Sequence, residues 1–444
     1  MIFRKPLLLI AFLLLSTSVF AQTGFYLLGN KKRSRIRFEL VNNLPVVQVE
    51  INGAPLSFIL DTGVKASVLF SLEAVDSIQL NNSSPVKLRG LGAGDHIEAL
   101  RSLGNTVKLG NAIDVNHLLF IIFDSNLNFS PRMGIPIHGI LGNDFFENFI
   151  VKIDYAKEVI TLYDPEKYSY RNCRKCEDFS LEFVEDKPYL KLMTFSDGVQ
   201  KEITLLVDSG SSDVLWLFDE EDFIKESPRN YFQDFLGLGL GGDIFGKRTR
   251  IPELRVGTLL LQNVNTSFPE ETAIIRARLF EERDGSIGGG FLRRFTVIFD
   301  YRGKRVRFKK NNYFDKPFHY DMSGLIIEHE GVELIKSEKQ TIVSIDPTNL
   351  AQGNTRHSLP ITTELEFSLV PQYIVVHVRE GSAAAVAGIQ KGDKVLTVKG
   401  RQSYRYKLYE LIELFSNDEG KEIKMEIERN GVKYKVKFEL ESVF

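Results

Sequence analysis

The stretch FILDTGVKASVL, residues 58–69, carries an aspartate out of an apolar run and follows it at once with a hydroxyl and a glycine. An apolar run that ends in small polar residues and a glycine is typical of a buried strand that leads into a turn. Asp61 therefore lies where such a strand ends, and a carboxylate at that place needs a partner or a chemical task.

The pattern around Asp61 occurs twice in the chain. The stretch ITLLVDSGSSDVLWL, residues 203–217, repeats it, and Asp208 follows Asp61 by 147 positions. Glycine-rich segments downstream keep this separation and match Gly90, Gly92 and Gly94 with Gly237, Gly239 and Gly241. A third block, offset by 146, matches Gly142, Phe145, Asp154 and Tyr155 with Gly288, Phe291, Asp300 and Tyr301. Three blocks at nearly one offset indicate a duplicated unit, whereas a single Asp-Thr-Gly could arise by chance.

Both copies of the repeat are rich in predicted strands. Segments such as PVVQVEI, FIVKIDY and VITLY contain β-branched and aromatic residues and are bounded by Asn-Gly, Gly-Ala-Gly and Asp-Pro turns. Short helices are expected at NDFFENF and GGFLRRF. We therefore predict a mainly β protein, in which a first lobe at residues 37–164 and a second lobe at residues 182–310 are joined by a charged linker at residues 165–181.

Two related lobes with an aspartate at matched turns suggest one site at a pseudo-twofold axis. If Asp61 and Asp208 face each other at hydrogen-bond distance, both cannot ionise cheaply and one keeps its proton. The pair then offers a base and an acid, which suits the activation of a water against a peptide carbonyl.

The residues beside each aspartate fit a close approach of the two turns. Gly63 and Gly210 avoid a clash that a Cβ would cause between the backbones. Thr62 and Ser209 are expected to hydrogen-bond across the axis and to hold the turns rigidly.

At these residues the sequence resembles the aspartic protease superfamily, namely its single-chain, two-lobed retropepsin-like or pepsin-like enzymes of the exported bacterial kind. The matching motifs are Asp61-Thr62-Gly63, Asp208-Ser209-Gly210 and the apolar-apolar-glycine motifs that end at Gly142 and Gly288. The resemblance implies that Asp61 and Asp208 are the catalytic dyad, that Gly142 and Gly288 support the active-site loops, and that peptides or proteins are the substrates. It also implies flap positions for the hairpins that carry Gly90, Gly92, Gly94, Gly237, Gly239 and Gly241.

The sequence departs from the family pattern after the first triplet, where Val64 and Lys65 replace the usual small residues. A Lys65 that points into the site would hold Asp61 ionised and prevent proton sharing, whereas one that points outward would not. The first glycine-rich hairpin also lacks the tyrosine typical of pepsin flaps, as retropepsins do. The alternative is a noncatalytic lobe pair that binds peptide or acts as a scaffold.

The sequence changes in character after Lys310. Residues 373–399 fit a strand, a short helix and a second strand, residues 404–415 fit a longer helix, and residues 422–438 fit a final hairpin. This part resembles a PDZ domain of the bacterial, permuted type. We expect a small α+β domain at residues 315–444 as a third unit of the chain.

A PDZ domain implies a site for peptides. In such domains an exposed strand edge accepts a peptide as an added strand, and a loop of backbone amides holds a C-terminal carboxylate. Ser323, Gly324 and Leu325 are the candidates for that loop, because they precede an apolar strand. The region 333–371 is longer and more polar than the family usually has. The alternative is a PDZ fold that only packs on the lobes.

The first 21 residues have the features of a secretory signal peptide. Arg4 and Lys5 precede an apolar run at residues 6–15, and small residues lead to a cleavage position after Ala21. The run is shorter than the ~20 residues of a spanning helix. We expect an exported protein, periplasmic or extracellular, without stable membrane insertion.

Other functional classes find little support in the sequence. A net charge of -2 gives no electrostatic basis for nucleic-acid binding, and the seven histidines lack metal-binding spacings. The two cysteines, Cys173 and Cys176, are spaced C-x-x-C in the linker, which in an exported protein is typical of a local disulfide or a surface dithiol. We therefore expect neither a metal nor a cofactor.

Overall fold

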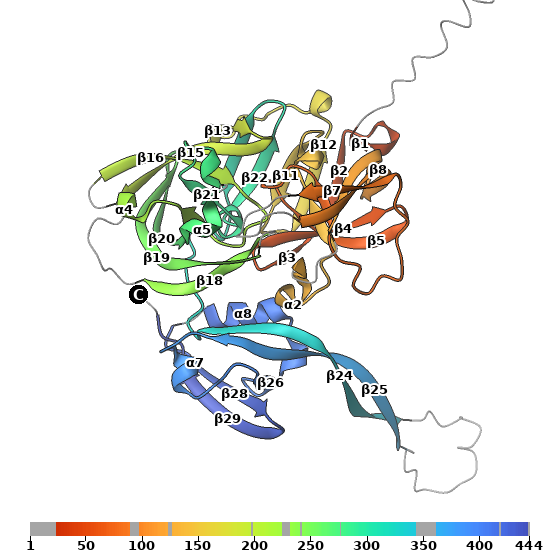
Figure 1. Ribbon diagram of the computed structural model, residues 1–444, viewed down its shortest axis with the longest axis vertical. Coiled ribbons are helices and arrows are strands. Elements are labelled where there is room, and N and C mark those ends of the chain that lie inside the picture. Colours follow the sequence, from red (N-terminus) through yellow and green to blue (C-terminus); the bar gives the residue numbers. More distant parts are fainter. Residues whose placement is uncertain are drawn as a thin grey trace, which may run out of the picture.

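The computed structural model describes most of the chain (Figure 1). The described residues are 24–88, 97–122, 127–196, 199–223, 231–239, 242–275, 277–342, 361–416 and 419–442. The expected signal peptide and the glycines Gly90, Gly92, Gly94 and Gly241 lie outside them. The described elements are mostly strands with short helices, which confirms the prediction of a mainly β protein.

The first lobe is built on one sheet with the strand order β1-β9-β6-β10-β5-β4-β8-β7, and β3 pairs with β4. β10 runs parallel to β5 and places Leu141 beside Leu60. The Asp61 amide donates to the Leu141 carbonyl at 3.0 Å, so this pairing fixes where the aspartate leaves its strand. The strands are β1 (Tyr26–Leu27), β3 (Glu39–Val41), β4 (Leu44–Ile51), β5 (Ala54–Leu60), β6 (Ser67–Leu69), β7 (Ser83–Leu88), β8 (Ile97–Leu109), β9 (Ala112–Ile121) and β10 (Gly139–Leu141).

The second lobe repeats this arrangement in its sheet β14-β15-β16-β21-β17-β20-β19-β18. β21 runs parallel to β16 and places Ile287 beside Val207, and the Asp208 amide donates to the Ile287 carbonyl at 2.9 Å. The duplication in sequence is therefore a duplication in topology. The strands are β14 (Glu182–Val184), β15 (Lys187–Ser196), β16 (Val199–Val207), β17 (Leu215–Leu217), β18 (Phe232–Gly239), β19 (Gly242–Val256), β20 (Leu259–Pro269) and β21 (Gly285–Ile287).

A six-stranded sheet, β13-β23-β22-β11-β12-β2, joins the two lobes. Its centre is the antiparallel pair of β11 and β22, with Lys152 opposite Ile298. Buried residues of both lobes form one continuous hydrophobic cluster around it, so the lobes share a core. The strands are β2 (Arg33–Arg37), β11 (Ile150–Asp154), β12 (Val159–Tyr163), β13 (Cys176–Ser180), β22 (Phe295–Asp300) and β23 (Arg305–Lys310).

The helices of the lobes are short. The two expected from the sequence are α3 (Asn143–Phe146) and α6 (Gly289–Leu292), which fully bury Phe145 and Phe291 at matched positions. Among the described residues no helix is both long and apolar enough to span a membrane. The others are η1 (Leu28–Asn30), α2 (Ser130–Met133), η3 (Pro165–Lys167), α4 (Glu220–Phe223), α5 (Glu271–Ile274) and η4 (Ala277–Leu279).

Two connecting segments have defined places. Cys173 and Cys176 form a disulfide in the linker between the lobes. The segment 311–320 packs on the second lobe, although the sequence analysis assigned residues from 315 onward to the PDZ domain. Phe314 and Phe318 are buried in the shared core, and the Tyr320 hydroxyl donates to the Thr266 carbonyl at 3.1 Å.

The C-terminal domain has its own sheet, β24-β25-β26-β28-β29, and a separate hydrophobic cluster. Its helix α8 buries Leu408, Leu411 and Phe415. Buried Asp393 pairs with Arg429 at 2.6 Å and joins the turn before β26 to β28. The elements are β24 (Leu325–Ile342), β25 (Ile361–Val378), α7 (Ala383–Val386), β26 (Lys394–Val398), β27 (Arg401–Gln402), η6 (Ser403–Arg405), α8 (Leu408–Ser416), β28 (Glu422–Arg429) and β29 (Val432–Glu439).

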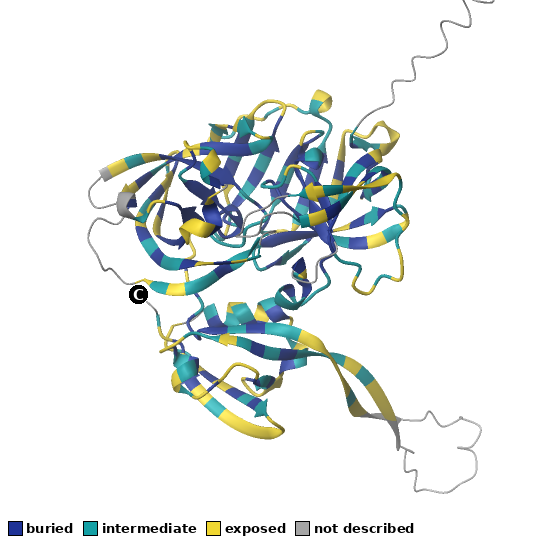
Figure 2. Cartoon of the chain, viewed as in Figure 1, coloured by how far each residue is buried: buried dark blue, intermediate teal, exposed yellow. Residues whose placement is uncertain are grey.

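In the long region seen in the sequence at residues 333–371, the described residues form a two-stranded arm from β24 and β25. Figure 1 shows the arm leaving the domain below the two lobes, and Figure 2 shows that its side chains are mostly exposed. Exposed apolar side chains on the arm include Leu334, Phe367 and Leu369. The described strands pair without interruption from Val332 to Ile342, so the added residues extend two PDZ strands.

Candidate active site

Asp61 and Asp208 meet between the two lobes. Asp61 directly follows β5, which pairs in parallel with β10, and Asp208 directly follows β16, which pairs in parallel with β21. Their carboxyl groups are hydrogen-bonded to one another. Asp61 is buried and Asp208 is half-buried. The sequence predicted that the two carboxyls face each other, and the structure brings them together.

The hydroxyl residues hold the two turns by reciprocal hydrogen bonds. The Thr62 amide donates to Ser209 Oγ at 3.1 Å, and the Ser209 amide donates to Thr62 Oγ1 at 3.0 Å. The hydroxyls in turn donate to the opposite strands, Thr62 to the Val207 carbonyl at 2.6 Å and Ser209 to the Leu60 carbonyl at 2.8 Å. Four buried hydrogen bonds therefore fix one aspartate turn against the other, as the sequence predicted.

The glycines of both triplets lie against the opposite carboxylate. A Cβ on Gly63 would lie 2.9 Å from Asp208 Oδ1, and a Cβ on Gly210 would collide with the carboxyl of Asp61. Each glycine amide also donates to its own aspartate, at 2.6 Å for Gly63 and 3.0 Å for Gly210. Any side chain at these two positions would push the carboxyls apart.

Gly142 and Gly288 lie beneath the aspartate turns. A Cβ on Gly142 would lie 2.8 Å from the Val64 carbonyl oxygen, and one on Gly288 would lie 2.5 Å from that of Asp213. The Gly288 amide donates to the Val214 carbonyl at 3.1 Å. Both glycines therefore allow the chain after β10 or β21 to pack directly on an active-site turn.

Lys65 points away from the site. Its ammonium group pairs with Asp186 Oδ2 at 2.5 Å, and its side chain is 69% exposed. The equivalent residue in the second lobe, Ser212, also contacts the opposite lobe, because its backbone carbonyl accepts a hydrogen bond from Asn43 at 2.9 Å. In each lobe the fourth residue after the aspartate thus contacts a hairpin turn of the other lobe.

The two aspartates differ in their electrostatic surroundings. Burial and the charge of Asp208 raise the pKa of Asp61 well above its ordinary value. Burial also raises the pKa of Asp208, but the nearby guanidinium of Arg283 opposes the rise. The cation near Asp208 therefore favours the arrangement in which the shared proton is on Asp61 and the negative charge on Asp208.

Arg283 was not identified from the sequence. It is buried just before β21, its Nε donates to the Gly285 carbonyl at 3.0 Å, and its guanidinium lies over the ring of Phe218. The third block of the repeat aligns it with Ile137 in the first lobe. A lone arginine beside an apolar-glycine motif was the only signal in the sequence.

Different polar networks support the two turns. In the first lobe Asp144 accepts from Ser67 Oγ at 3.1 Å and lies 3.3 Å from His117 Nε2, while His117 Nδ1 lies 3.0 Å from Asp114. Ser67, Asp114 and His117 are buried, and the side chain of Asp144 is 28% exposed. The network rigidifies the segment that follows Asp61.

In the second lobe the corresponding acceptor is Asp213. It accepts from Trp216 Nε1 at 2.6 Å, from Ser267 Oγ at 3.0 Å and from Arg248 at 2.9 Å. Neither network was predicted, because the central carboxylates do not recur at the offset of the repeat: Asp144 aligns with Gly290 and Asp213 with Ala66.

The hairpin β18–β19 carries Gly237 and Gly239, which the sequence placed at a flap position. This hairpin reaches the first lobe, where the guanidinium of Arg132 lies 4.0 Å from the centre of the Phe235 ring and 3.5 Å from Asp243. A Cβ on Gly237 would meet no atom within 4 Å, so no neighbour requires a glycine there. The flap role of the two glycines stays a prediction.

The predicted carboxylate-binding loop of the C-terminal domain faces inward. Ser323 is fully buried, and the Gly324 amide donates to Asp321 Oδ1 at 2.6 Å. Ser323 Oγ also donates to Asp321, and it accepts from the Leu325 amide at 3.1 Å. Burial raises the pKa of this internal carboxyl to about 6. A peptide carboxylate would have to displace Asp321, and peptide binding at this loop stays a prediction.

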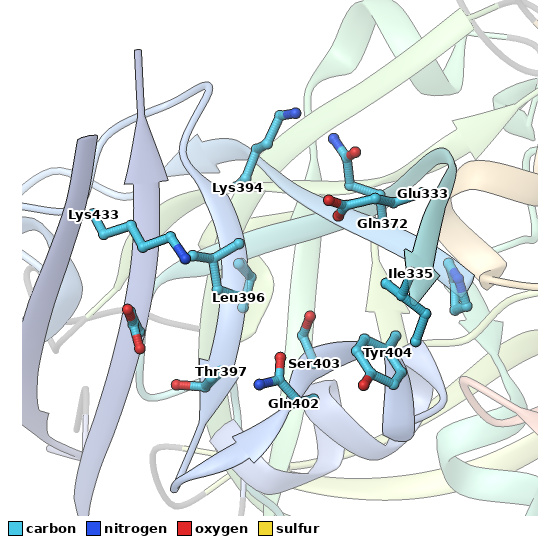
Figure 3. Close-up of a pocket in the computed structure, with 13 residues that line it drawn as sticks. Glu333, Ile335, Gln372, Lys394, Leu396, Thr397, Gln402, Ser403, Tyr404 and Lys433 are labelled. Atoms are coloured by element: carbon cyan, nitrogen blue, oxygen red, sulfur yellow. The ribbon is translucent and has the colours of Figure 1, made fainter. Parts of the chain in front are cut away.

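A cavity of about 200 Å³ opens in the C-terminal domain and not between the lobes (Figure 3). It lies where β25 separates from β26, since these strands pair only at Ile374 and Lys394. Its walls carry charges of both signs, including Glu333 and Lys433. It is therefore distinct from the aspartate pair.

Family comparisons agree with this geometry. Residues 47–145 match the model of an aspartyl protease family, and residues 374–429 match the model of a PDZ domain family. No curated protein matches the sequence significantly. The chain thus contains an aspartyl protease domain and a C-terminal PDZ domain. The second lobe lies outside the first match and is related to it by the repeat.

Proposed function

We propose that this protein is an aspartic endopeptidase that hydrolyses peptide bonds of protein substrates with a water activated by Asp61 and Asp208, and that its PDZ domain binds peptides. The observation that carries the proposal is the hydrogen-bonded carboxyl pair, held by reciprocal bonds between Thr62 and Ser209. An aspartyl protease domain and a PDZ domain both fit peptide or protein binding.

The difference between the carboxyls gives each a role. Ionised Asp208 takes a proton from the water, whose oxygen attacks the peptide carbonyl carbon, while Asp61 gives its proton to the carbonyl oxygen. The tetrahedral product then breaks its carbon–nitrogen bond as Asp208 returns a proton to the leaving nitrogen and Asp61 recovers one from a hydroxyl. The step consumes one water and leaves the pair with its single proton.

Asp61→Asn and Asp208→Asn test the mechanism. We expect each to lower the cleavage of an unfolded protein by about 10²-fold or more, because each removes an acid–base group. The measurement is the rate of fragment formation between pH ~3 and 7, with exposed Asp76→Asn as the control. Cleavage that survives both active-site changes would rule out the dyad.

The alternative is a noncatalytic peptide-binding or scaffolding protein. A wild-type protein that binds peptides but cleaves none across this pH range would support it. Lys65 was the main sequence feature that favoured a noncatalytic protein. Its side chain points outward and its charge is paired with Asp186, so it no longer supports that alternative.

We also propose that the protein is exported. The charged start, the apolar run and the small residues before Ala21 support this. Expression of the whole chain in a bacterium should give a mature protein that begins at Gln22 outside the cytoplasm. The measurement is N-terminal sequencing of the fractions, and an intact Met1 terminus in the cytoplasm alone would contradict export.

A further inference from the structure

The groove side of the PDZ domain faces the protease. β24 is the edge strand of its sheet, where a peptide can add as a further strand, and the resemblance to permuted PDZ domains implies that α8 lines the same groove. Helix α2 of the first lobe lies against both elements, and Figure 1 shows it directly above them. A Cβ on Gly134, at the end of α2, would lie only 2.5 Å from Leu408 Cβ at the start of α8. The protease therefore occupies this surface itself.

Charge complementarity fixes this contact. Arg132 of α2 donates through Nε to Glu328 of β24 at 2.8 Å, and the Glu328 side chain is only 19% exposed. Beside it, Lys407 pairs with Glu39 of the first lobe at 2.5 Å. A partly buried Glu328 without a cation would lose a charge-assisted hydrogen bond, so the groove selects a basic side chain.

The same arginine also contacts the second lobe. The Arg132 guanidinium lies on the ring of Phe235 in β18 and near Asp243 in β19, at 4.0 and 3.5 Å. One side chain of the first lobe thus contacts the PDZ domain and the flap-position hairpin of the second lobe. Movement of Arg132 with its PDZ partner would remove contacts that hold this hairpin against the first lobe.

We propose that α2 is the internal occupant of the PDZ groove, and that a peptide with an arginine or lysine competes with Arg132 for Glu328 and so loosens the β18–β19 hairpin. The proposal rests on the proposed function only in that the PDZ domain takes a peptide. It gives that domain a ligand class, a basic peptide, and a consequence, easier entry of substrate between the lobes.

Hydrogen exchange tests the coupling without requiring cleavage. In the full chain carrying Asp208→Asn, Glu328→Gln should speed amide exchange in residues 232–239 and 242–256 by about tenfold, because it removes the charge that holds Arg132 beside this hairpin. Lys108→Ala is the matched control, because it breaks a similar ion pair with Glu50 at 2.6 Å that is remote from the groove. Unchanged hairpin exchange in Glu328→Gln would overturn the coupling.

A peptide tests the occupant. The segment LNFSPRMGIPI, residues 127–137, should bind the same protein and speed hairpin exchange, whereas the peptide with glutamine in place of arginine should not. Equal effects of the two peptides, or no effect of either, would overturn the competition. In the wild-type chain Glu328→Gln should also raise kcat/KM for a protein substrate. A protein that never cleaves but shows the exchange changes would refute the protease function and leave this inference standing.

Discussion

At the scale of single residues, Arg283 distinguishes two aspartates that the repeat makes equivalent. Its buried guanidinium acts on Asp208, and the matched residue beside Asp61 is the apolar Ile137. A carboxyl near a cation ionises more readily, so Arg283 favours the negative charge on Asp208 rather than on Asp61.

The substitution Arg283→Gln should shift the acid limb of the pH–rate profile to higher pH. Asp208 must be ionised to act as the base, and loss of the cation raises its pKa, so activity is lost at a higher pH as the solution is acidified. The measurement is kcat/KM against pH. Arg278→Gln is the control, because this guanidinium also lies over Phe218 but pairs with Asp219. An unmoved acid limb in Arg283→Gln would contradict the role.

At the scale of turns and hairpins, close packing of one turn against another is found at the rigid aspartate turns. The aspartate turns lie against each other so tightly that Gly63 and Gly210 have no room for a Cβ. The hairpin β18–β19 has room at Gly237. The glycines of the aspartate turns and Gly237 of the hairpin therefore differ in whether a close neighbour requires them.

Gly210→Ala should destabilise the protein and abolish cleavage, whereas Gly237→Ala should do neither. The first change forces a Cβ into the Asp61 carboxyl, and overpacking of this kind costs about 1–3 kcal/mol. The second adds a Cβ where no atom lies within 4 Å. Thermal unfolding and cleavage rates of the two variants measure the difference, and similar values would contradict the close approach.

The turns also show what a sequence can and cannot predict. Asp61, Asp208, Thr62 and Ser209 were predictable because they recur at one offset and their chemistry needs a partner. Lys65 was ambiguous, because its direction depends on Asp186, a residue in a turn of the other lobe. Arg283 and Arg132 were not predictable, because their contacts arise only when distant segments meet and no local pattern marks them.

At the scale of the whole molecule, three units depend on one another to different degrees. The lobes share a sheet and a core, whereas the PDZ domain has a core of its own. It contacts the protease through polar pairs with the first lobe, through Tyr409 of α8, which packs on that lobe, and through Arg379, which lies 4.5 Å from the centre of the Phe232 ring in β18. The segment 311–320 belongs to the second lobe, since it buries Phe314 and Phe318 there.

The effect of a C-terminal truncation on stability and activity should depend strongly on the residue at which the chain ends. A chain that ends after Tyr320 should fold and keep its cleavage activity, while one that ends after Lys310 loses two buried phenylalanines, each worth about 1.5–3 kcal/mol. Thermal unfolding and cleavage of the two proteins measure this. Equal stability of both would contradict the assignment of residues 311–320 to the second lobe.

The sheet of β11 and β22 joins two lobes of a single chain, so a mutation can change one half of the site without changing the other. An enzyme assembled from two copies of one chain carries every mutation twice, so a cation gained beside one aspartate would also stand beside the other. Here each half is encoded separately, and an arginine at position 283 leaves Ile137 as it was. Because both halves stand in one chain at separate positions, each carboxyl can have neighbours of its own.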